Sequence, residues 1–155
     1  MQNITIIVLG KLKENYWRDA ETEYLKRLAP FAKLKIIELR EEPFSEKDAL
    51  EKVKEKEAIK ILKTLEKIKN PHIIALDQNG TEFFSEKFSE RLYKISGEVV
   101  FILGGPLGLH GSIKNMAKEQ FSLSRLTFTH QMARVILLEQ IYRAAMIKSG
   151  RKYHY

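Results

Sequence analysis

The sequence contains no cysteine, one tryptophan and only four prolines among its 155 residues. Without cysteine the chain can form no disulfide, no thiolate nucleophile and no thiolate metal site. Its apolar runs are strand-sized, well short of the roughly 20 residues that a membrane-spanning helix requires. The N-terminal segment lacks the basic start and the cleavage site of a signal peptide, so we expect a cytoplasmic protein without a membrane partner.

Several catalytic motifs are missing as well. The glycine-rich stretch Gly104–Gly108 does not match GxGxxG, and no GK[ST] follows it, so neither a dinucleotide fingerprint nor a Walker loop is present. The four histidines show no metal-ligand spacing, so we expect no metal. Ser122 and Ser124 do not belong to a G-x-S-x-G turn. The sequence thus lacks the parts for hydrolysis and favours a reaction in which a cofactor brings the reactive group.

Positive charge is plentiful and unevenly placed. The formal net charge is +7, and from Lys114 onward eight cations face only two carboxylates, Glu119 and Glu139. Scattered lysines often do no more than keep a surface soluble. Charge of one sign beside a candidate ligand loop is better explained by a polyanionic partner, and we favour nucleic acid.

Strand and helix patterns alternate along the chain. The expected strands are Ile4–Leu9, Leu34–Leu39, His72–Leu76, Val99–Leu103 and the extended segment Phe121–Ser124. The expected helices run from about Tyr16 to before Pro30, from Phe44–Asp48 to about Lys67, over Ser85–Tyr93, near Ile113–Lys118 and over His130–Lys148. Residues 1–155 therefore predict one α/β domain with a mainly parallel sheet covered by helices on both faces.

The ends of these helices follow from capping signals. Asn15, Ser85 and Thr129 are predicted N-caps, and Phe44–Asp48 combines a staple residue, an N-cap and early acids. Gly150 is the predicted C-terminal stop of the last helix. The sequence Asp77-Gln78-Asn79-Gly80 predicts a turn that ends the third strand.

The candidate ligand site lies where three strands end. Leu76 ends one strand, Gly104 follows a buried β-branched strand, and Leu123–Phe128 follows the extended segment. Open α/β sheets hold ligands at the carboxyl ends of their strands. These three segments offer peptide N–H and C=O groups to a ligand such as adenine. The GGPxG loop taken alone is equally well explained as a tight structural turn.

Four segments together resemble a known family: Leu76-Asp77 with Gly80, then ILGGPLGL, then SLSRLTFTHQMARVILLEQIYRAAMI, and a closing YH. They resemble the SPOUT superfamily of S-adenosylmethionine methyltransferases. Within it, the match is to the family that methylates N3 of a pseudouridine in helix 69 of bacterial 23S ribosomal RNA. The resemblance covers the whole chain and is strongest from Val99 onward. Leu107 and Thr129 depart from it: Leu107 stands where an acidic or polar residue is usual, and Thr129 stands where a proline is usual.

The resemblance implies a deep trefoil knot in the C-terminal half, an exception to the rule that chains avoid threading themselves. It also implies a homodimer acting on 23S rRNA, as a large subunit or an assembled ribosome. The residues it assigns to the S-adenosylmethionine site are Leu76, Gly104, Leu123, Ser124, Arg125, Leu126, Thr127 and Phe128.

Two further residues are candidates for the methyl-transfer step. Arg143 is suited to stabilise the negative charge that develops on the imide, and His154 is suited to accept the N3 proton. The alternatives are a phosphate contact for Arg143 and a disordered end for His154, and a base is not strictly required. The residues expected to contact RNA are His130, Arg134, Arg143, Tyr153 and His154.

The last predicted helix is apolar on more than one side. One stripe carries Leu137, Leu138, Ile141, Ala144 and Ala145, and we expect it to pack against its symmetry mate in a dimer. The tail after Gly150 would then lie beside the partner's cofactor loops. Two other interpretations remain: a non-catalytic RNA- or ribosome-binding protein, and a SPOUT enzyme with a different RNA target.

Overall fold

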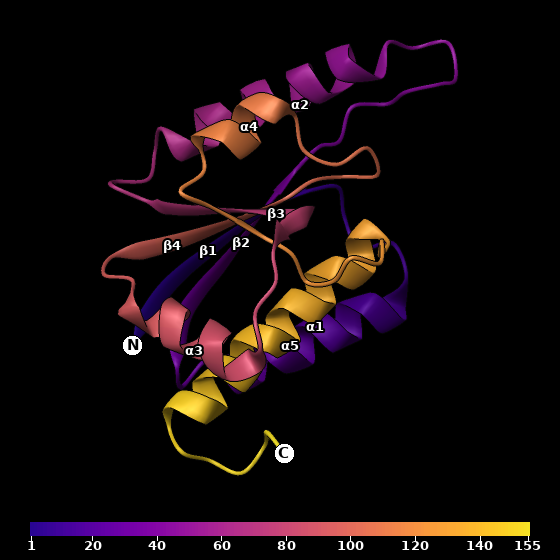
Figure 1. Ribbon diagram of the computed structural model, residues 1–155. Coiled ribbons are helices and arrows are strands. Elements are labelled where there is room, and N and C mark those ends of the chain that lie inside the picture. The colour runs from indigo at the N-terminus through magenta and orange to yellow at the C-terminus, as the bar shows by residue number, and fades with distance from the viewer.

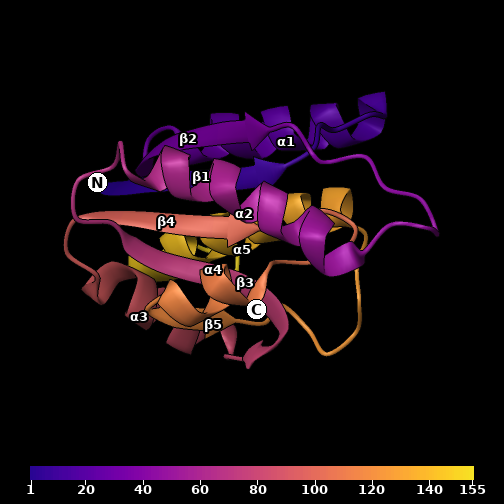
Figure 2. The ribbon, with the colours of Figure 1, turned by 90° about the horizontal axis from the view of Figure 1, so that it is seen from above.

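A computed structural model describes residues 1–155, and its centre is one sheet of five parallel strands. The strands follow the order β2-β1-β4-β3-β5 across the sheet (Figure 2). Their bounds are β1 Gln2–Leu9, β2 Ala32–Leu39, β3 His72–Thr81, β4 Glu98–Leu103 and β5 Glu119–Phe121. Because every strand points the same way, all their carboxyl ends lie along one edge.

Five helices cover the two faces of this sheet. They are α1 Asn15–Leu28, α2 Leu50–Leu65, α3 Ser85–Lys94, α4 Gly111–Met116 and α5 His130–Lys148. Helices α2 and α4 lie on one face, and α1, α3 and α5 lie on the other (Figure 1). The predicted α/β architecture is confirmed, while the threading of a knot stays a prediction.

The central strand β4 supplies both hydrophobic cores. Val99, Val100, Phe101 and Ile102 have no exposed surface. Successive side chains alternate between faces, so Phe101 packs in the core beneath α3 and α5 while Val100 packs in the core beneath α2. This two-sided burial explains why the sequence of the strand is an uninterrupted apolar run.

Helix α5 buries its apolar stripe within its own chain. Leu137, Leu138, Ile141, Ala144 and Ala145 are each at most 2% exposed. The expectation that this stripe packs against a symmetry mate is therefore wrong. The cover comes from the sheet and the two flanking helices: Ser89 of α3 donates a hydrogen bond to the carbonyl of Ala144 at 2.8 Å.

The predicted helix ends are partly confirmed. Thr129 caps α5, because its hydroxyl accepts a hydrogen bond from the amide of Met132 at 3.3 Å. Gly150 follows α5 with a left-handed φ of 64°, as a C-terminal stop requires. The predictions for Asn15 and Ser85 are wrong: each is the first residue of its helix, and neither α1 nor α3 has a side-chain cap.

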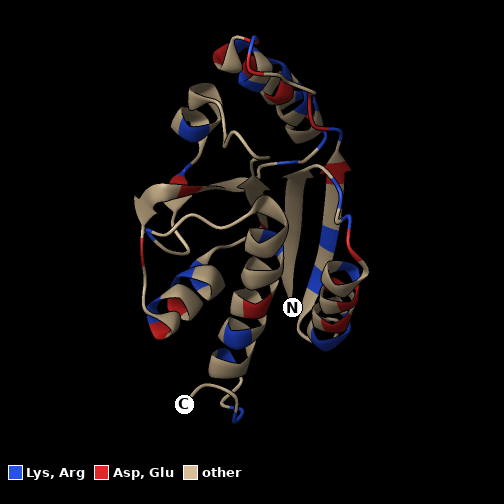
Figure 3. Ribbon diagram, turned by 90° about the vertical axis from the view of Figure 1, so that its right-hand side faces the viewer, with Lys and Arg blue, Asp and Glu red and all other residues tan.

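Helix α2 begins later than predicted, at Leu50. Ser45 and Asp48 close a turn of their own, since the amide of Asp48 donates to the carbonyl of Ser45 at 3.1 Å and the Ser45 hydroxyl donates to the Asp48 carboxylate at 3.0 Å. Acidic and basic residues are mixed along α2, as expected for a solvated face (Figure 3). One of them, Glu57, is buried, and burial raises its pKa.

The turn predicted at Asp77–Gly80 does not end the third strand, because β3 continues to Thr81 with a register shift against β5. Gly80 is required there by close approach: a Cβ at this position would lie 2.7 Å from the backbone of Gln120. Strand β5 ends at Phe121, earlier than the predicted Ser124. No helix in the structure combines the length and the apolar character needed to cross a membrane.

Candidate active site

A pocket of about 420 Å³ lies at the carboxyl edge of the sheet. Its walls are the ends of β3 and β4, the loop Gly104–Leu109 after β4 and the segment Leu123–Phe128 after β5. Helix α5 adds His130 at its first turn. The structure therefore brings together the three strand-end segments that were predicted to form the ligand site, at the edge where open α/β sheets hold ligands.

The glycine loop is folded tightly upon itself. The amide of Gly108 donates to the carbonyl of Gly105 at 3.0 Å, and Gly108 adopts a left-handed φ of 76°. A Cβ at Gly104 would lie only 2.6 Å from the backbone of Gly108. Gly104 is thus required by the turn itself. The loop is therefore both a tight structural turn and a part of the pocket wall.

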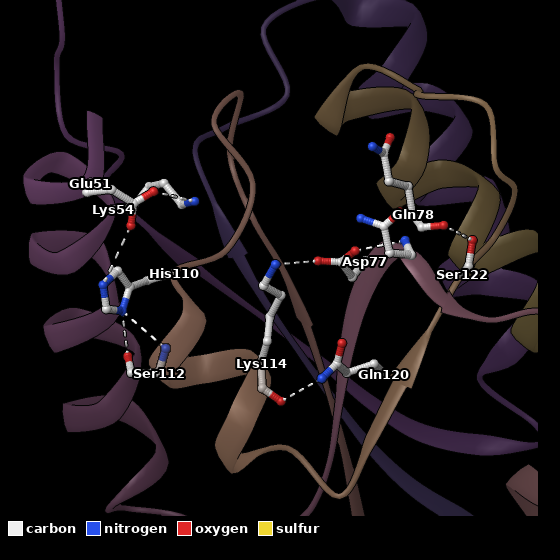
Figure 4. A network of polar contacts seen from close by, with 10 residues as sticks. Glu51, Lys54, Asp77, Gln78, His110, Ser112, Lys114, Gln120 and Ser122 are labelled. Atoms are coloured by element: carbon white, nitrogen blue, oxygen red, sulfur yellow. Dashed lines mark hydrogen bonds and ion pairs between the residues drawn. The ribbon is translucent and has the colours of Figure 1, made fainter. Parts of the chain in front are cut away.

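The segment after β5 is tied to the end of β3 by Gln78. The hydroxyl of Ser122 donates to the Gln78 carbonyl at 3.1 Å (Figure 4), and the hydroxyl of Thr127 donates to the Gln78 side-chain oxygen at 2.6 Å. Ser122 is 2% exposed. This role of Gln78 could not be predicted, because nothing in the sequence pairs it with Thr127, 49 positions away.

A charged pair stands in the pocket wall. The ammonium of Lys114 lies 2.9 Å from the carboxylate of Asp77 (Figure 4), and the Asp77 side chain is 12% exposed. Burial raises the pKa of Asp77, but hydrogen bonds from Lys114 and from the amide of Asn79 outweigh it and hold that pKa below its usual value. The Asp77 side chain is therefore a carboxylate at neutral pH.

Seven of the eight residues predicted to bind the cofactor line this pocket: Leu76, Gly104, Leu123, Ser124, Leu126, Thr127 and Phe128. Arg125 does not line it; its side chain is 90% exposed and lies 3.9 Å from Glu82. An arginine at that position points to solvent, so only its backbone remains a candidate for ligand contact.

Arg134 does not lie on an RNA-accessible surface. Its side chain is 5% exposed, it forms two hydrogen bonds with Glu21, and its Nη1 lies 2.8 Å from Glu38. The prediction that Arg134 contacts RNA is therefore wrong for this fold, because both sides of its guanidinium are occupied by carboxylates of α1 and β2.

His130 lines the pocket and carries an unusual buried atom. Its Nε2 is buried without a hydrogen-bond partner, and so is the carboxylate atom Oε2 of Glu41. Both atoms lie near Gly10, at 3.6 Å and 3.1 Å from the position that a Cβ would take there. Glu41 lies in the loop after β2, and no motif in the sequence marks it as a residue that lies near His130.

Arg143, Tyr153 and His154 form a second cluster beside α5. Arg143 Nη1 lies 3.2 Å from His154 Nδ1, and its Nη2 donates to Glu139 at 2.7 Å. The hydroxyl of Tyr153 donates to the same Glu139 oxygen at 3.0 Å, and burial together with that bond raises the pKa of Tyr153. The structure brings these three predicted residues together.

The two clusters lie apart within one chain. Arg143 follows His130 by 13 residues on α5, which separates them by about 20 Å along the helix axis. No group of three or more His, Cys, Asp or Glu side chains is placed to hold a metal ion. The pocket thus provides a site for a small ligand, and the second cluster provides cationic and imidazole groups at a distance from it.

Comparison with known proteins identifies the class of this protein. The family described as predicted SPOUT methyltransferases matches residues 2–154, and the chain belongs to that family. The family assignment made from the sequence is confirmed.

Individual relatives are more specific. Proteins from Clostridium acetobutylicum, Clostridium novyi and Streptococcus uberis, which are 42%, 46% and 45% identical to this chain, are each named Ribosomal RNA large subunit methyltransferase H. Each alignment covers 97% or 98% of this chain and 98% or 99% of the relative. A solved structure described as a probable methylase family protein from Haemophilus influenzae Rd KW20 is similar with a TM-score of 0.57 at 13% identity, over 99% of this chain and 71% of that one. That structural likeness concerns the fold alone.

Proposed function

We propose that the protein transfers the methyl group of S-adenosylmethionine to N3 of a pseudouridine in helix 69 of 23S ribosomal RNA. The single observation that carries the proposal is the pocket at the sheet edge, lined by seven of the eight residues assigned from the family resemblance. The names of the relatives support a target in the large ribosomal subunit. Such a substrate places the reaction in the cytoplasm.

The lining of the pocket fits the cofactor. Gly104, Gly105 and Gly108 line the pocket without side chains, and peptide groups match an adenine edge, which has both donors and acceptors. Leu76, Leu103 and Phe128 add apolar surface for the flat faces of the ring. When bound, S-adenosylmethionine supplies a methyl group already activated on a sulfonium sulfur. The protein then contributes to catalysis by positioning the reactants and by electrostatic stabilisation.

The acceptor nitrogen carries an imide proton, which must leave as the methyl group arrives. The guanidinium of Arg143 is suited to stabilise the negative charge that develops on the base. A guanidinium only donates, so the His154 Nδ1 that faces it is the acceptor, and Nε2–H donates to Glu86 at 2.9 Å. A base role requires Nδ1 of His154 to accept the N3 proton, which it can do only after releasing Arg143.

A dimer would place the two clusters together. The separation along α5 keeps Arg143 and His154 from the pocket of their own chain. We infer that these residues, with Tyr153, complete the pocket of the partner subunit. The exposed cations Lys148, Arg151 and Lys152 would then lie beside the RNA.

The proposal is tested by following labelled methyl transfer to ribosomes, large subunits and free rRNA that carry the target pseudouridine, with mass spectrometry to locate the product. We expect one N3-methyl group at helix 69. Arg143→Met and Thr127→Trp, which fills the pocket from an exposed position, should each reduce transfer at least a hundredfold. Mixed dimers of the two variants contain one intact composite site and should regain part of the activity.

Three outcomes would contradict the proposal. If the protein binds S-adenosylhomocysteine but transfers no methyl group to any RNA, the alternative of a non-catalytic RNA-binding protein holds. A methyl group on another nucleotide would change the target. Mixed dimers that form but stay inactive would place Arg143 and the tail in the site of their own chain.

A further inference from the structure

The charged residues of the pocket are unevenly distributed. Its only ionisable lining residues are Lys54, Asp77, Lys114 and His130. Lys54 belongs to α2 and Lys114 to α4, and these two helices lie on the same face of the sheet (Figure 1). The close view shows both lysines with Asp77, beside the loop that follows β4 (Figure 4). Two cations and one carboxylate thus give this side of the pocket a net positive charge.

Lys54 is the most buried lysine on its helix, ahead of Lys60, whose side chain is 33% exposed and paired with Glu42 outside the pocket. Lys52, Lys56 and Lys63 are exposed, whereas the Lys54 side chain is 18% exposed and lines the pocket. Its partner Glu51, at 3.1 Å, is 74% exposed. An exposed carboxylate of this kind binds a lysine weakly and competes poorly with another anion.

Both ammonium groups retain hydrogen-bonding capacity. An ammonium has three N–H donors, whereas Lys114 contacts one oxygen of Asp77 and Lys54 contacts one oxygen of Glu51. Asp77 is also held by the amide of Asn79 at 2.8 Å. The fixed Asp77 carboxylate therefore holds the Lys114 ammonium in the pocket wall while leaving donors for a second acceptor.

S-Adenosylmethionine carries one negative group, the α-carboxylate of its amino-acid end. Its adenine and ribose are neutral, and its sulfonium and ammonium groups are positive. We propose that Lys114 and Lys54 bind this carboxylate, with Asp77 as the positioning residue for Lys114. The inference rests on the proposed function, because it requires S-adenosylmethionine as the ligand.

This subsite fixes the direction in which the cofactor lies. The amino-acid end is drawn toward α2 and α4, while the neutral adenosine end is left to the glycine loop and to Leu123–Phe128. Charge-assisted hydrogen bonds are roughly twice as strong as neutral ones, so this end supplies affinity as well as direction.

The test compares two ligands that differ only in the carboxylate: S-adenosylhomocysteine and its decarboxylated analogue. Calorimetry on the wild-type protein should show weaker binding of the analogue. Lys114→Met should weaken S-adenosylhomocysteine binding about tenfold to a hundredfold and change analogue binding less than about twofold. Lys118→Met, an equal loss of charge at an exposed residue outside the pocket, is the matched control and should change neither.

A second variant controls for the charge left on Asp77. Asp77→Asn combined with Lys114→Met keeps the pair neutral and should bind S-adenosylhomocysteine as weakly as Lys114→Met alone. Recovery of affinity in this double variant would overturn the inference, since the unpaired carboxylate would then explain the loss.

Other results separate this inference from the proposed function. If the wild-type protein binds both ligands equally well, the carboxylate subsite is refuted and the cofactor pocket stands. If Lys114→Met weakens both ligands equally, Lys114 supports the pocket without contacting the carboxylate, and the inference is overturned. If the wild-type protein binds neither ligand, the proposed function fails and this inference fails with it.

Discussion

Helix α5 carries two arginines that were both expected to contact RNA, and the structure uses them differently. Arg134, near the pocket, is 5% exposed and lies between Glu21 of α1 and Glu38 of β2. Arg143, near the tail, is 25% exposed and has one carboxylate partner, Glu139 on its own helix. The carboxylates opposite each arginine make the difference: Arg134 joins three elements of the fold, whereas Arg143 contacts only its own helix and the tail and stays partly exposed.

The largest effect expected from this contrast is on stability. Arg134→Met leaves two carboxylates without their partner and should lower the free energy of unfolding by about 3–5 kcal/mol. Arg143→Met removes a partly exposed pair and should cost less than about 1 kcal/mol. Urea unfolding followed by circular dichroism measures both values. Similar losses for the two variants would show that Arg143 is as structural as Arg134.

A smaller effect, on ligand binding, is expected in the pocket, where Thr127 contacts Gln78. Thr127→Val removes the 2.6 Å hydrogen bond and keeps the shape of the side chain. The loss should weaken S-adenosylhomocysteine binding by about 1 kcal/mol, or roughly fivefold. Gln78→Ala should have a similar effect, and the double variant should be little worse than either. Additive losses would mean that the two residues act independently.

The smallest effect concerns acid stability and compares a carboxylate from each cluster. The folded-state pKa of Asp77 is lowered, so its carboxylate stabilises the fold above the unfolded-state pKa of about 3.9, and the contribution is lost as pH falls through the lower folded-state value. Asp77→Asn should therefore lose less stability than the wild type between about pH 6 and about pH 3.

Glu86 near the tail is the control for that measurement. Its pKa is also lowered, by its own backbone amide and by His154, but the side chain is 65% exposed. Solvent screens such a group, so Glu86→Gln should follow the wild-type profile of urea midpoint against pH. A profile that changes more for Glu86→Gln than for Asp77→Asn would reverse the expected order of the two clusters.

Much of the fold could be predicted because its signals are local. The β-branched run Val99–Leu103, the Thr129 cap and the Gly150 stop are each recorded in a few adjacent residues, and the structure has all three. The start of α2 could not be predicted, because the bonds between Ser45 and Asp48 compete with the cap that the same residues suggest.

The site was predictable where a motif marks it and not where distant residues meet. Gly104 and Leu123–Phe128 stand in segments that resemble a family, and their place in the pocket follows. The burial of Arg134 depends on Glu21 and Glu38, which lie 113 and 96 residues away in the chain. Lys54 likewise reaches the pocket from a helix whose charge pattern is that of a solvated face.

The position of β4 has a consequence for how the chain is made. β1 and β3 do not pair with each other, and only β4 joins them, with Asn3 opposite Glu98 and His72 opposite Val99. During synthesis the first 97 residues therefore leave the ribosome with the middle of the sheet missing. Neither hydrophobic core can form before Leu103 has emerged, and the core beneath α3 and α5 also needs the buried stripe of α5, so the nascent protein completes its fold only when nearly the whole chain has been made.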